Sequence, residues 1–212
     1  MSLTLTQKPR TLADTLALPS WLLVPAASLV IAACAQVSIP LPFTPVPLTG
    51  QTFAVLLTGM ALGSRRGALA VALYVLEGGL GLPFFAGGAA GLAKLIGPTG
   101  GYLFAFPLAA FLAGTLAERG WDRKPLTTAL GMLLASLTIF LFGALWLAQF
   151  VGGIVPAVVQ GVLPFLPGDV LKSLLAAGLL PVSWRFICTA QHRVSQAPAT
   201  DSSTRTAQRE ES

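Results

Sequence analysis

The sequence predicts an all-α integral membrane protein, with six transmembrane helices joined by proline- and glycine-rich extracellular loops. Of its 212 residues, 54% are hydrophobic and only 10% are charged, against roughly 25% charged in a soluble domain. The mean hydropathy is +0.77. A soluble surface must stay polar to remain hydrated, whereas a surface in contact with lipid need not. The spacing of basic residues along the chain predicts the number of times that it crosses the membrane.

The first two apolar segments are separated by a proline-rich stretch. A polar segment, residues 1–20, precedes the first apolar segment at residues 21–37. Residues 38–50 contain four prolines, and because proline lacks a backbone N–H and fixes φ, they predict extended, stiff backbone. The second segment, residues 51–63, is about 20 Å long as a helix, against a hydrocarbon core of ~30 Å. We therefore expect residues 38–50 to fold into the membrane region above it.

The third, fourth and fifth apolar segments follow with two different kinds of connection. The third, residues 67–82, begins after a short basic junction and leads into a glycine-rich stretch that ends at Gly101. The fourth, residues 101–117, ends at a charged loop, residues 118–124. The fifth segment, residues 125–151, is the longest apolar run in the sequence.

The sixth segment ends the membrane region. A proline- and glycine-rich connector, residues 152–168, precedes it, and the segment itself covers residues 169–187. The tail is rich in Ser, Thr and Gln and is expected to be disordered. The prediction is one membrane domain, residues 21–190, between a cytoplasmic N-terminal segment and a cytoplasmic tail, residues 191–212.

Loop charges predict the orientation. Basic residues fall on every second connection, and the connections between them carry only Lys94, with Lys172 just inside the sixth segment. Cations favour the cytoplasmic side of a membrane. We therefore expect a multi-pass protein of the cell (plasma) membrane with both termini in the cytoplasm and an even number of spans. The basic residues concerned are Lys8, Arg10, Arg65, Arg66, Arg119, Arg123, Lys124, Arg185, Arg193, Arg205 and Arg209.

Motifs for catalysis or energy coupling are missing from the sequence. The glycine-rich run that ends at Lys94 has Leu95 where a phosphate-binding loop needs Ser or Thr. The single histidine, His192, lies in the tail, so neither a histidine metal site nor a catalytic triad is expected. The scattered cations do not form a nucleic-acid surface. We expect no enzyme, no cofactor, no metal and no nucleic-acid partner.

The ionisable residues of the membrane region are the candidates for a site, because charges at membrane depth are costly. Asp169 and Lys172 are three residues apart and share a helix face. Asp169 follows Pro167-Gly168 and could simply cap the helix. Capping does not explain Lys172, because a cation in the first turn opposes the helix dipole. Lys172 needs an anionic partner, either Asp169 alone or Asp169 together with a ligand carboxylate.

Two further charges lie on the predicted outer side. Lys94 is the only cation of its loop, and Glu77 ends the third segment. Each could be a solvated surface charge or part of a site. The three irregular stretches also lie on this side, and irregular backbone at membrane depth persists only where it is buried in protein or lines a cavity. Together these features predict an outward-facing pocket beneath rigid loops.

Four motifs in this region resemble one known family. They recur in order, and the resemblance extends from the first segment to the sixth. The motifs are IPLPFTPVPLTGQ at residues 39–51, LPFFAGG at residues 82–88, GPTGGY at residues 97–102 and LPGDVLK at residues 166–172. On these residues the chain resembles the BioY family, the biotin-specific S subunits that capture substrate for energy-coupling-factor transporters.

The resemblance implies six helices, an extracellular biotin pocket, and as partners a transmembrane coupling subunit and two ATPase subunits. It implies that Asp169 accepts a ureido N–H of biotin and that Lys172 or Lys94 pairs with its carboxylate. Packing on the ring is expected from the remaining candidates, which are Phe43, Tyr102 and the backbone of Gly87 and Gly88. In the family, a pair of small residues four apart on the first segment contacts the coupling subunit, and Ser28 and Ala32 are the nearest match here.

Other interpretations remain open at this point. An S subunit for a different vitamin would keep the fold and change the pocket. A membrane scaffold protein would have no need of Asp169 and Lys172, and a membrane enzyme would need a nucleophile beside Asp169, which the sequence does not offer. Residues 31–34 resemble a lipoprotein cleavage box ending at Cys34. Cleavage there would leave five spans, so we expect these small residues to allow close helix packing instead.

Overall fold

The computed structural model describes residues 11–15 and 18–195, with side chains as far as Phe186. In this part of the chain, helices dominate and the only strands are two residues long. The long helices are α1 (Ser20–Gln36), α2 (Gln51–Leu62), α3 (Ser64–Gly79), α5 (Gly100–Glu118), α6 (Pro125–Val151) and α8 (Leu166–Ser195). The short elements are η1 (Ala13–Thr15), β1 (Ser38–Ile39), β2 (Leu48–Thr49), η2 (Ala86–Gly88), α4 (Leu92–Ile96), η3 (Trp121–Arg123), α7 (Ile154–Gly161) and η4 (Leu163–Phe165).

Among the residues that the structure describes, three stretches of helix are long and apolar enough to cross a membrane by length and composition. They are Gly100–Glu118, Pro125–Val151 and Ile154–Phe186. Two shorter apolar helices, α1 and α2, accompany them. An all-helical membrane protein, as the composition predicts, is therefore what the chain forms.

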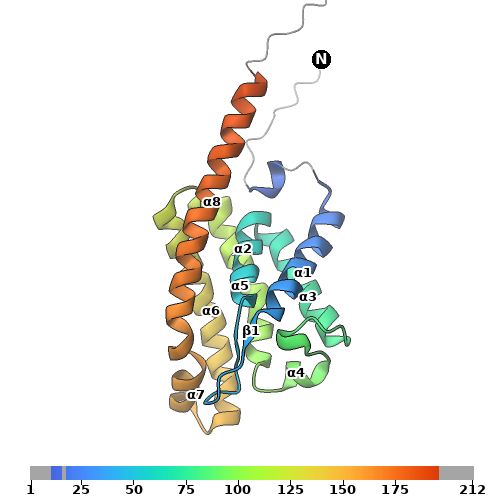
Figure 1. Cartoon of the computed structure of the whole chain (residues 1–212), viewed down its shortest axis with the longest axis vertical. Helices are drawn as coiled ribbons and strands as arrows, with labels where there is room; N and C mark the ends of the chain where they lie inside the picture. Colours follow the sequence, from blue (N-terminus) through green and yellow to red (C-terminus); the bar gives the residue numbers. More distant parts are fainter. Residues whose placement is uncertain (1–10, 16–17, 196–212) are drawn as a thin grey trace, which may run out of the picture.

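Helix α5 lies at the centre of the bundle. It packs against α2, α3 and α6, while α8 packs on α6 and α1 on α3 (Figure 1). Two glycines permit these close contacts. A Cβ at Gly59 would lie 2.3 Å from the Ala110 carbonyl oxygen, and a Cβ at Gly114 would lie 2.3 Å from the Ser64 nitrogen. Small residues thus let helix backbones approach directly, as is common in membrane bundles.

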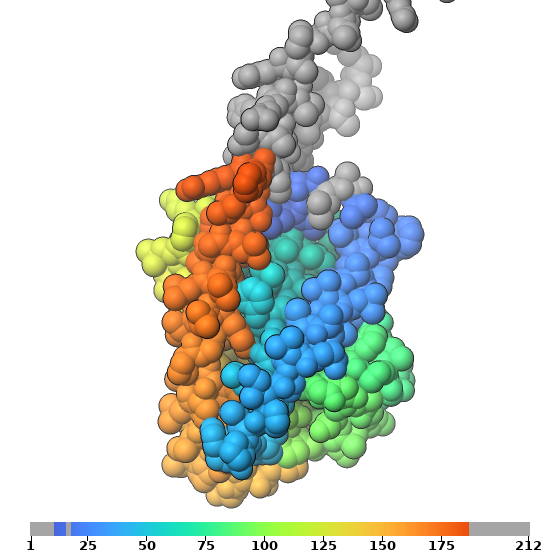
Figure 2. Space-filling view, in the orientation of Figure 1, coloured from blue at the N-terminus to red at the C-terminus, as the bar shows by residue number. Residues whose placement is uncertain are grey.

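The outer faces of the peripheral helices are strongly apolar. On α8, Leu171, Leu174 and Leu175 are each about 60% exposed, and on α6 Leu137 is 62% exposed. Figure 2 shows α8 and α1 along the two sides of one face, with α2 recessed between them. A soluble protein does not expose leucine in continuous stripes, so these faces suit contact with lipid.

One end of the bundle carries the basic loops. Arg66 forms an ion pair with Asp14 at 2.9 Å, and Glu118 accepts hydrogen bonds from the Ser64 nitrogen at 2.7 Å and from its hydroxyl at 2.8 Å. Because Glu118 satisfies the first N–H of α3, this helix begins at Ser64 and not at residue 67 as predicted.

The same end contains a buried carboxylate in the loop between α5 and α6. Asp122 is fully buried, accepts a hydrogen bond from the Trp184 indole N–H, and leaves its other oxygen, Oδ1, without a partner. The guanidinium carbon of Arg123 lies 4.8 Å from the centre of the Trp184 ring. Burial raises the pKa of Asp122, although the Trp184 hydrogen bond and the Arg123 charge oppose the shift. This loop ties α8 to the bundle.

The opposite end carries the irregular elements. The proline-rich stretch forms no helix, as predicted, and its ends pair as antiparallel strands β1 and β2. The hairpin, α4 and α7 lie together at this end of the molecule (Figure 1). The sequence predicts loops where α4 and α7 form, because these helices of five and eight residues lie within glycine- and proline-rich stretches whose composition favours turns.

The last helix is longer than predicted at both ends. It begins at Leu166, so Asp169 lies within its first turn and does not cap it. Pro167 is compatible with this start, because the first N–H groups of a helix have no intrahelical acceptor. The helix continues to Ser195, past the predicted end of the sixth segment at residue 187. The predictions for residues 1–10 and 196–212 lie outside the described residues.

Candidate ligand-binding site

A cavity of about 110 Å³ lies at the end of the bundle that carries the hairpin. The β1–β2 hairpin, the loop before α4, and helices α2, α5, α6 and α8 all contribute to its wall. On this measure about 10–15 Å³ suffices for one water molecule, so the cavity has room for a small organic ligand. It lies where the sequence predicts a pocket beneath the irregular loops.

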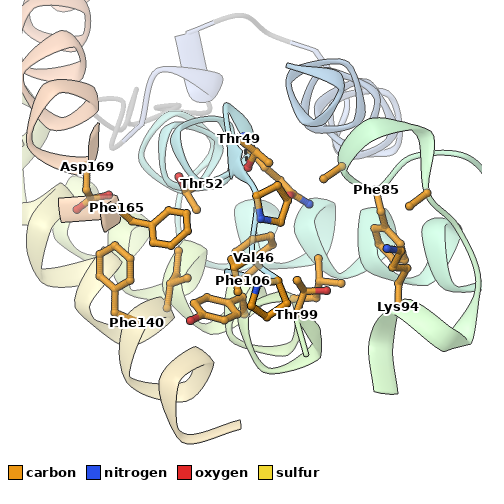
Figure 3. A pocket seen from close by; sticks show the side chains of 18 of the residues that line it. Val46, Thr49, Thr52, Phe85, Lys94, Thr99, Phe106, Phe140, Phe165 and Asp169 are labelled. Carbon is orange, nitrogen blue, oxygen red and sulfur yellow. Dashed lines mark hydrogen bonds between the residues drawn. The ribbon is translucent and has the colours of Figure 1, made fainter. Parts of the chain in front are cut away.

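Most of the cavity wall is apolar and aromatic (Figure 3). Phe85 reaches it from the loop after α3, Phe106 from α5, Phe140 from α6 and Phe165 from η4. Phe85 is held in place by an edge-on contact with Tyr74, at 5.8 Å between ring centres. Such a wall suits the apolar body of a ligand, while a few polar groups determine its orientation.

Asp169 is the acidic residue of the cavity. It is 5% exposed, and its Oδ2 accepts a hydrogen bond of 2.6 Å from the Ser136 hydroxyl on α6. Its other oxygen, Oδ1, has no hydrogen bond in the described part of the chain. Because Asp169 lines the cavity, this oxygen is available to accept an N–H from a ligand.

Lys172 lies one turn further along α8, on the same face. Its Nζ donates to the Thr49 carbonyl oxygen at 2.6 Å and to the Thr52 hydroxyl at 2.8 Å. Among the described residues it forms no ion pair with Asp169, so the two charges are held by different neighbours. An ammonium group has three N–H donors, which leaves one for a ligand.

Lys94 is the third charged residue of the cavity wall. It lies on α4, is exposed, and makes no hydrogen bond or ion pair within the described ranges. Figure 3 shows Lys94 and Asp169 at opposite ends of the cavity, with Val46 and Phe106 between them. Two ammonium groups and one carboxylate leave the wall with a net charge of +1, which is complementary to a monoanion.

Tyr102, a candidate from the resemblance, also lines the cavity. Its hydroxyl donates to the Gly161 carbonyl oxygen at 2.9 Å, and its ring fills the space beside Gly143, where a Cβ would lie 2.2 Å away. Since its only O–H is used inside the protein, Tyr102 offers a ligand an aromatic surface and no donor.

Four of the sequence candidates do not line the cavity. Phe43 is 58% exposed at the hairpin. Gly87 and Gly88 adopt left-handed backbone conformations, with φ of 66° and 75°, and the cavity is lined instead by the neighbouring Ala86 and Ala89. Such φ values favour glycine, so this pair shapes the loop.

Glu77, the fourth candidate, faces α1 instead. It accepts a hydrogen bond from the Ser28 hydroxyl. Ser28 and Ala32, the small pair expected to contact a coupling subunit, are only 0% and 6% exposed. They pack inside the chain because α1 lies against α3, so the expectation of an outward contact at this pair is wrong for this conformation. Ala35 is likewise buried, in accord with close packing of the small residues around Cys34.

Sequence reasoning missed several polar groups of the site. Thr49 and Thr52 lie in or next to the proline-rich motif, but their pairing with Lys172 joins residues more than a hundred positions apart. Gln51 donates to the Tyr74 hydroxyl, which donates to the Phe84 carbonyl oxygen at 3.1 Å. No local pattern signals such contacts between distant segments. The described residues contain no cluster of metal-ligating side chains.

Residues 7–188 match the BioY family. The chain is 46% identical over 142 residues to a probable biotin transporter BioY of Pyrococcus horikoshii, covering 67% of this chain and 82% of that protein. It is 42% identical over 143 residues to the biotin transporter BioY of Thermotoga maritima, covering 66% and 81%.

A solved structure shares the fold. The crystal structure of the S-component for biotin from an ECF-type ABC transporter aligns with a TM-score of 0.70 at 24% identity, over 78% of this chain and 90% of that one. The helical arrangement in Figure 1 is thus shared with that S-component. With the family match over most of the sequence, it follows that the chain belongs to the BioY family.

Proposed function

We propose that this protein binds biotin in the cavity between α8 and α4 and delivers it to an energy-coupling-factor transporter as the substrate-capture S subunit. The sequence relatives are biotin transporters by name, and the solved structure with the same fold is an S-component for biotin. As a member of this family, the chain is a substrate-binding membrane protein rather than an enzyme.

The observation that carries the proposal is the distribution of polar groups around the cavity. Biotin has a ureido ring with N–H donors, an apolar bicycle and a carboxylate tail. The free oxygen of Asp169 suits a ureido N–H, and the aromatic wall suits the bicycle. Lys94, at the far end of the cavity, suits the carboxylate (Figure 3), while the remaining N–H of Lys172 contributes a second donor near Asp169.

The proposed topology follows from the two ends of the bundle. The six long helices span the plasma membrane, with the end that carries Arg65 and Arg119 in the cytoplasm and the cavity open to the outside. The positive-inside rule supports this orientation, and the exposed leucine stripes on α6 and α8 support contact with lipid along the helices. Since the sequence has no nucleotide-binding motif, we propose that energy comes from two ATPase subunits through a transmembrane coupling subunit.

A titration of the purified chain with biotin tests the function. We expect saturable binding of one biotin per chain, and loss of affinity in Asp169→Asn. Asp122→Asn is the matched control, because Asp122 is equally buried but lies at the other end of the bundle. If the chain binds another vitamin in preference to biotin, the proposed substrate is wrong, but the proposed role as an S subunit stands. Biotin binding that is unchanged in Asp169→Asn would reject this site.

A further inference from the structure

Ser136 on α6 contacts the proposed ligand-binding carboxylate without lining the cavity itself. It lies one turn before Ile139 and Phe140, which do line the cavity, and faces the first turn of α8. Both partners are almost completely buried, with Ser136 3% and Asp169 5% exposed. The contact joins two helices at a point where water has little access.

The single hydroxyl hydrogen of Ser136 has two acceptors within reach. The Leu133 carbonyl oxygen lies 3.0 Å away and Asp169 Oδ2 lies 2.6 Å away. A serine inside a helix commonly returns its hydrogen to a carbonyl of its own preceding turn. Here the carboxylate is the closer acceptor, and 2.6 Å is the length expected for a hydroxyl bound to a charged oxygen. The Ser136 hydroxyl therefore donates its hydrogen bond to Asp169.

We propose that Ser136 is a positioning residue for ligand recognition, which holds Asp169 Oδ2 so that only Oδ1 accepts from the ligand. This inference rests on the proposed function. This hydrogen bond restricts rotation of the carboxylate and leaves Oδ1 as the oxygen without a protein donor. Without Ser136, Asp169 can rotate, and binding must then restrict that rotation.

The test compares biotin affinities of purified variants by calorimetric titration. Loss of a hydrogen bond to a charged group corresponds to a change in an equilibrium constant of roughly ten- to a hundredfold. We expect Ser136→Ala to weaken biotin affinity about tenfold. The rest of the lost hydrogen-bond energy should appear as a lower melting temperature of the free protein. Ser136→Thr keeps the hydroxyl and should restore most of the affinity. Ser136→Cys, of similar size with a weak donor, should lie between the two and replaces Ser136→Ala if that variant does not fold.

The matched control is Ser173→Ala. Ser173 is 2% exposed on α8, one turn after Asp169, and is not part of the cavity wall. The same loss of a buried hydroxyl should leave biotin affinity at the wild-type value. An equal loss in Ser173→Ala would show that burial alone explains the effect and would overturn the proposal.

A double-mutant cycle shows whether Ser136 acts through Asp169. In an Asp169→Asn background, Ser136→Ala should cause little further loss of affinity, because the carboxylate that it positions is gone. A full additional tenfold loss there, or wild-type affinity in Ser136→Ala alone, would overturn the inference. If Asp169→Asn itself binds biotin normally, the proposed site fails first, and this result is distinct from a failure of Ser136 alone.

Discussion

Replacing Lys172 by methionine removes one charge from the cavity wall and keeps a side chain of similar length. In the structure, the ammonium donates to the Thr49 carbonyl oxygen and the Thr52 hydroxyl and lies on the same helix face as Asp169. The variant therefore removes a donor to the ligand and leaves the buried Asp169 carboxylate without a nearby cation. The net charge of the wall falls from +1 to zero, because Lys94 and Asp169 remain.

The expected magnitude follows from these contacts. Removing a hydrogen bond that a charged donor makes to the ligand costs about 1.5–3 kcal/mol of binding energy, or roughly 10-fold to 100-fold in biotin affinity. If Lys172 only ties α8 to the hairpin, the loss appears in thermal stability and the affinity stays unchanged. Thr52→Val separates the two roles further, since it removes one acceptor of the ammonium and keeps the charge. We expect it to weaken binding by a few-fold at most.

The assay is a biotin titration of detergent-purified variants, with the melting temperature measured on the same samples. Lys94→Met is measured beside Lys172→Met, as the variant that removes the other lysine of the cavity wall. Because Lys94 is exposed, water and salt screen its charge, and we expect only a few-fold loss of affinity. Wild-type biotin affinity in a folded Lys172→Met protein would refute the reasoning.

Three other predictions concern the remainder of the fold. Because the pKa of Asp122 is raised, this carboxyl group binds its proton more tightly in the folded state than in the unfolded state. The contribution of Asp122 to stability should therefore be complete below about pH 4 and decline as the pH rises through the raised pKa. Asp122→Asn should remove this decline in a series of melting temperatures against pH, and an unchanged profile would contradict the prediction. Gly114→Ala should lower the free energy of unfolding by about 1–3 kcal/mol through overpacking. Gly178 has open space around it, so Gly178→Ala should be neutral or stabilising by up to about 1 kcal/mol. Equal effects of the two substitutions in denaturation experiments would contradict the packing argument. In a variant without native cysteines, a cysteine at Arg65 should react with an impermeant thiol reagent only after cells are opened, while one at Lys94 should react from outside, and the reverse pattern would refute the topology.

Much of the fold could be predicted because membrane insertion depends on local composition. The fifth apolar segment was predicted at residues 125–151, which are the bounds of α6. Asp169, Lys172 and Lys94 are candidates by their charge and Tyr102 by the family resemblance, and all four line one cavity. A charge within an apolar segment stands out because lipid penalises it, so such residues can be found without knowledge of the packing.

The pairing of these residues was decided only by the tertiary structure. Asp169 and Lys172 suggest an ion pair by their spacing, yet Asp169 is bound by Ser136 and Lys172 by Thr49 and Thr52. Apolar periodicity and charge report where each side chain lies relative to lipid and water. They do not report which groups meet across packed helices, because such contacts depend on how α2, α6 and α8 are placed against one another.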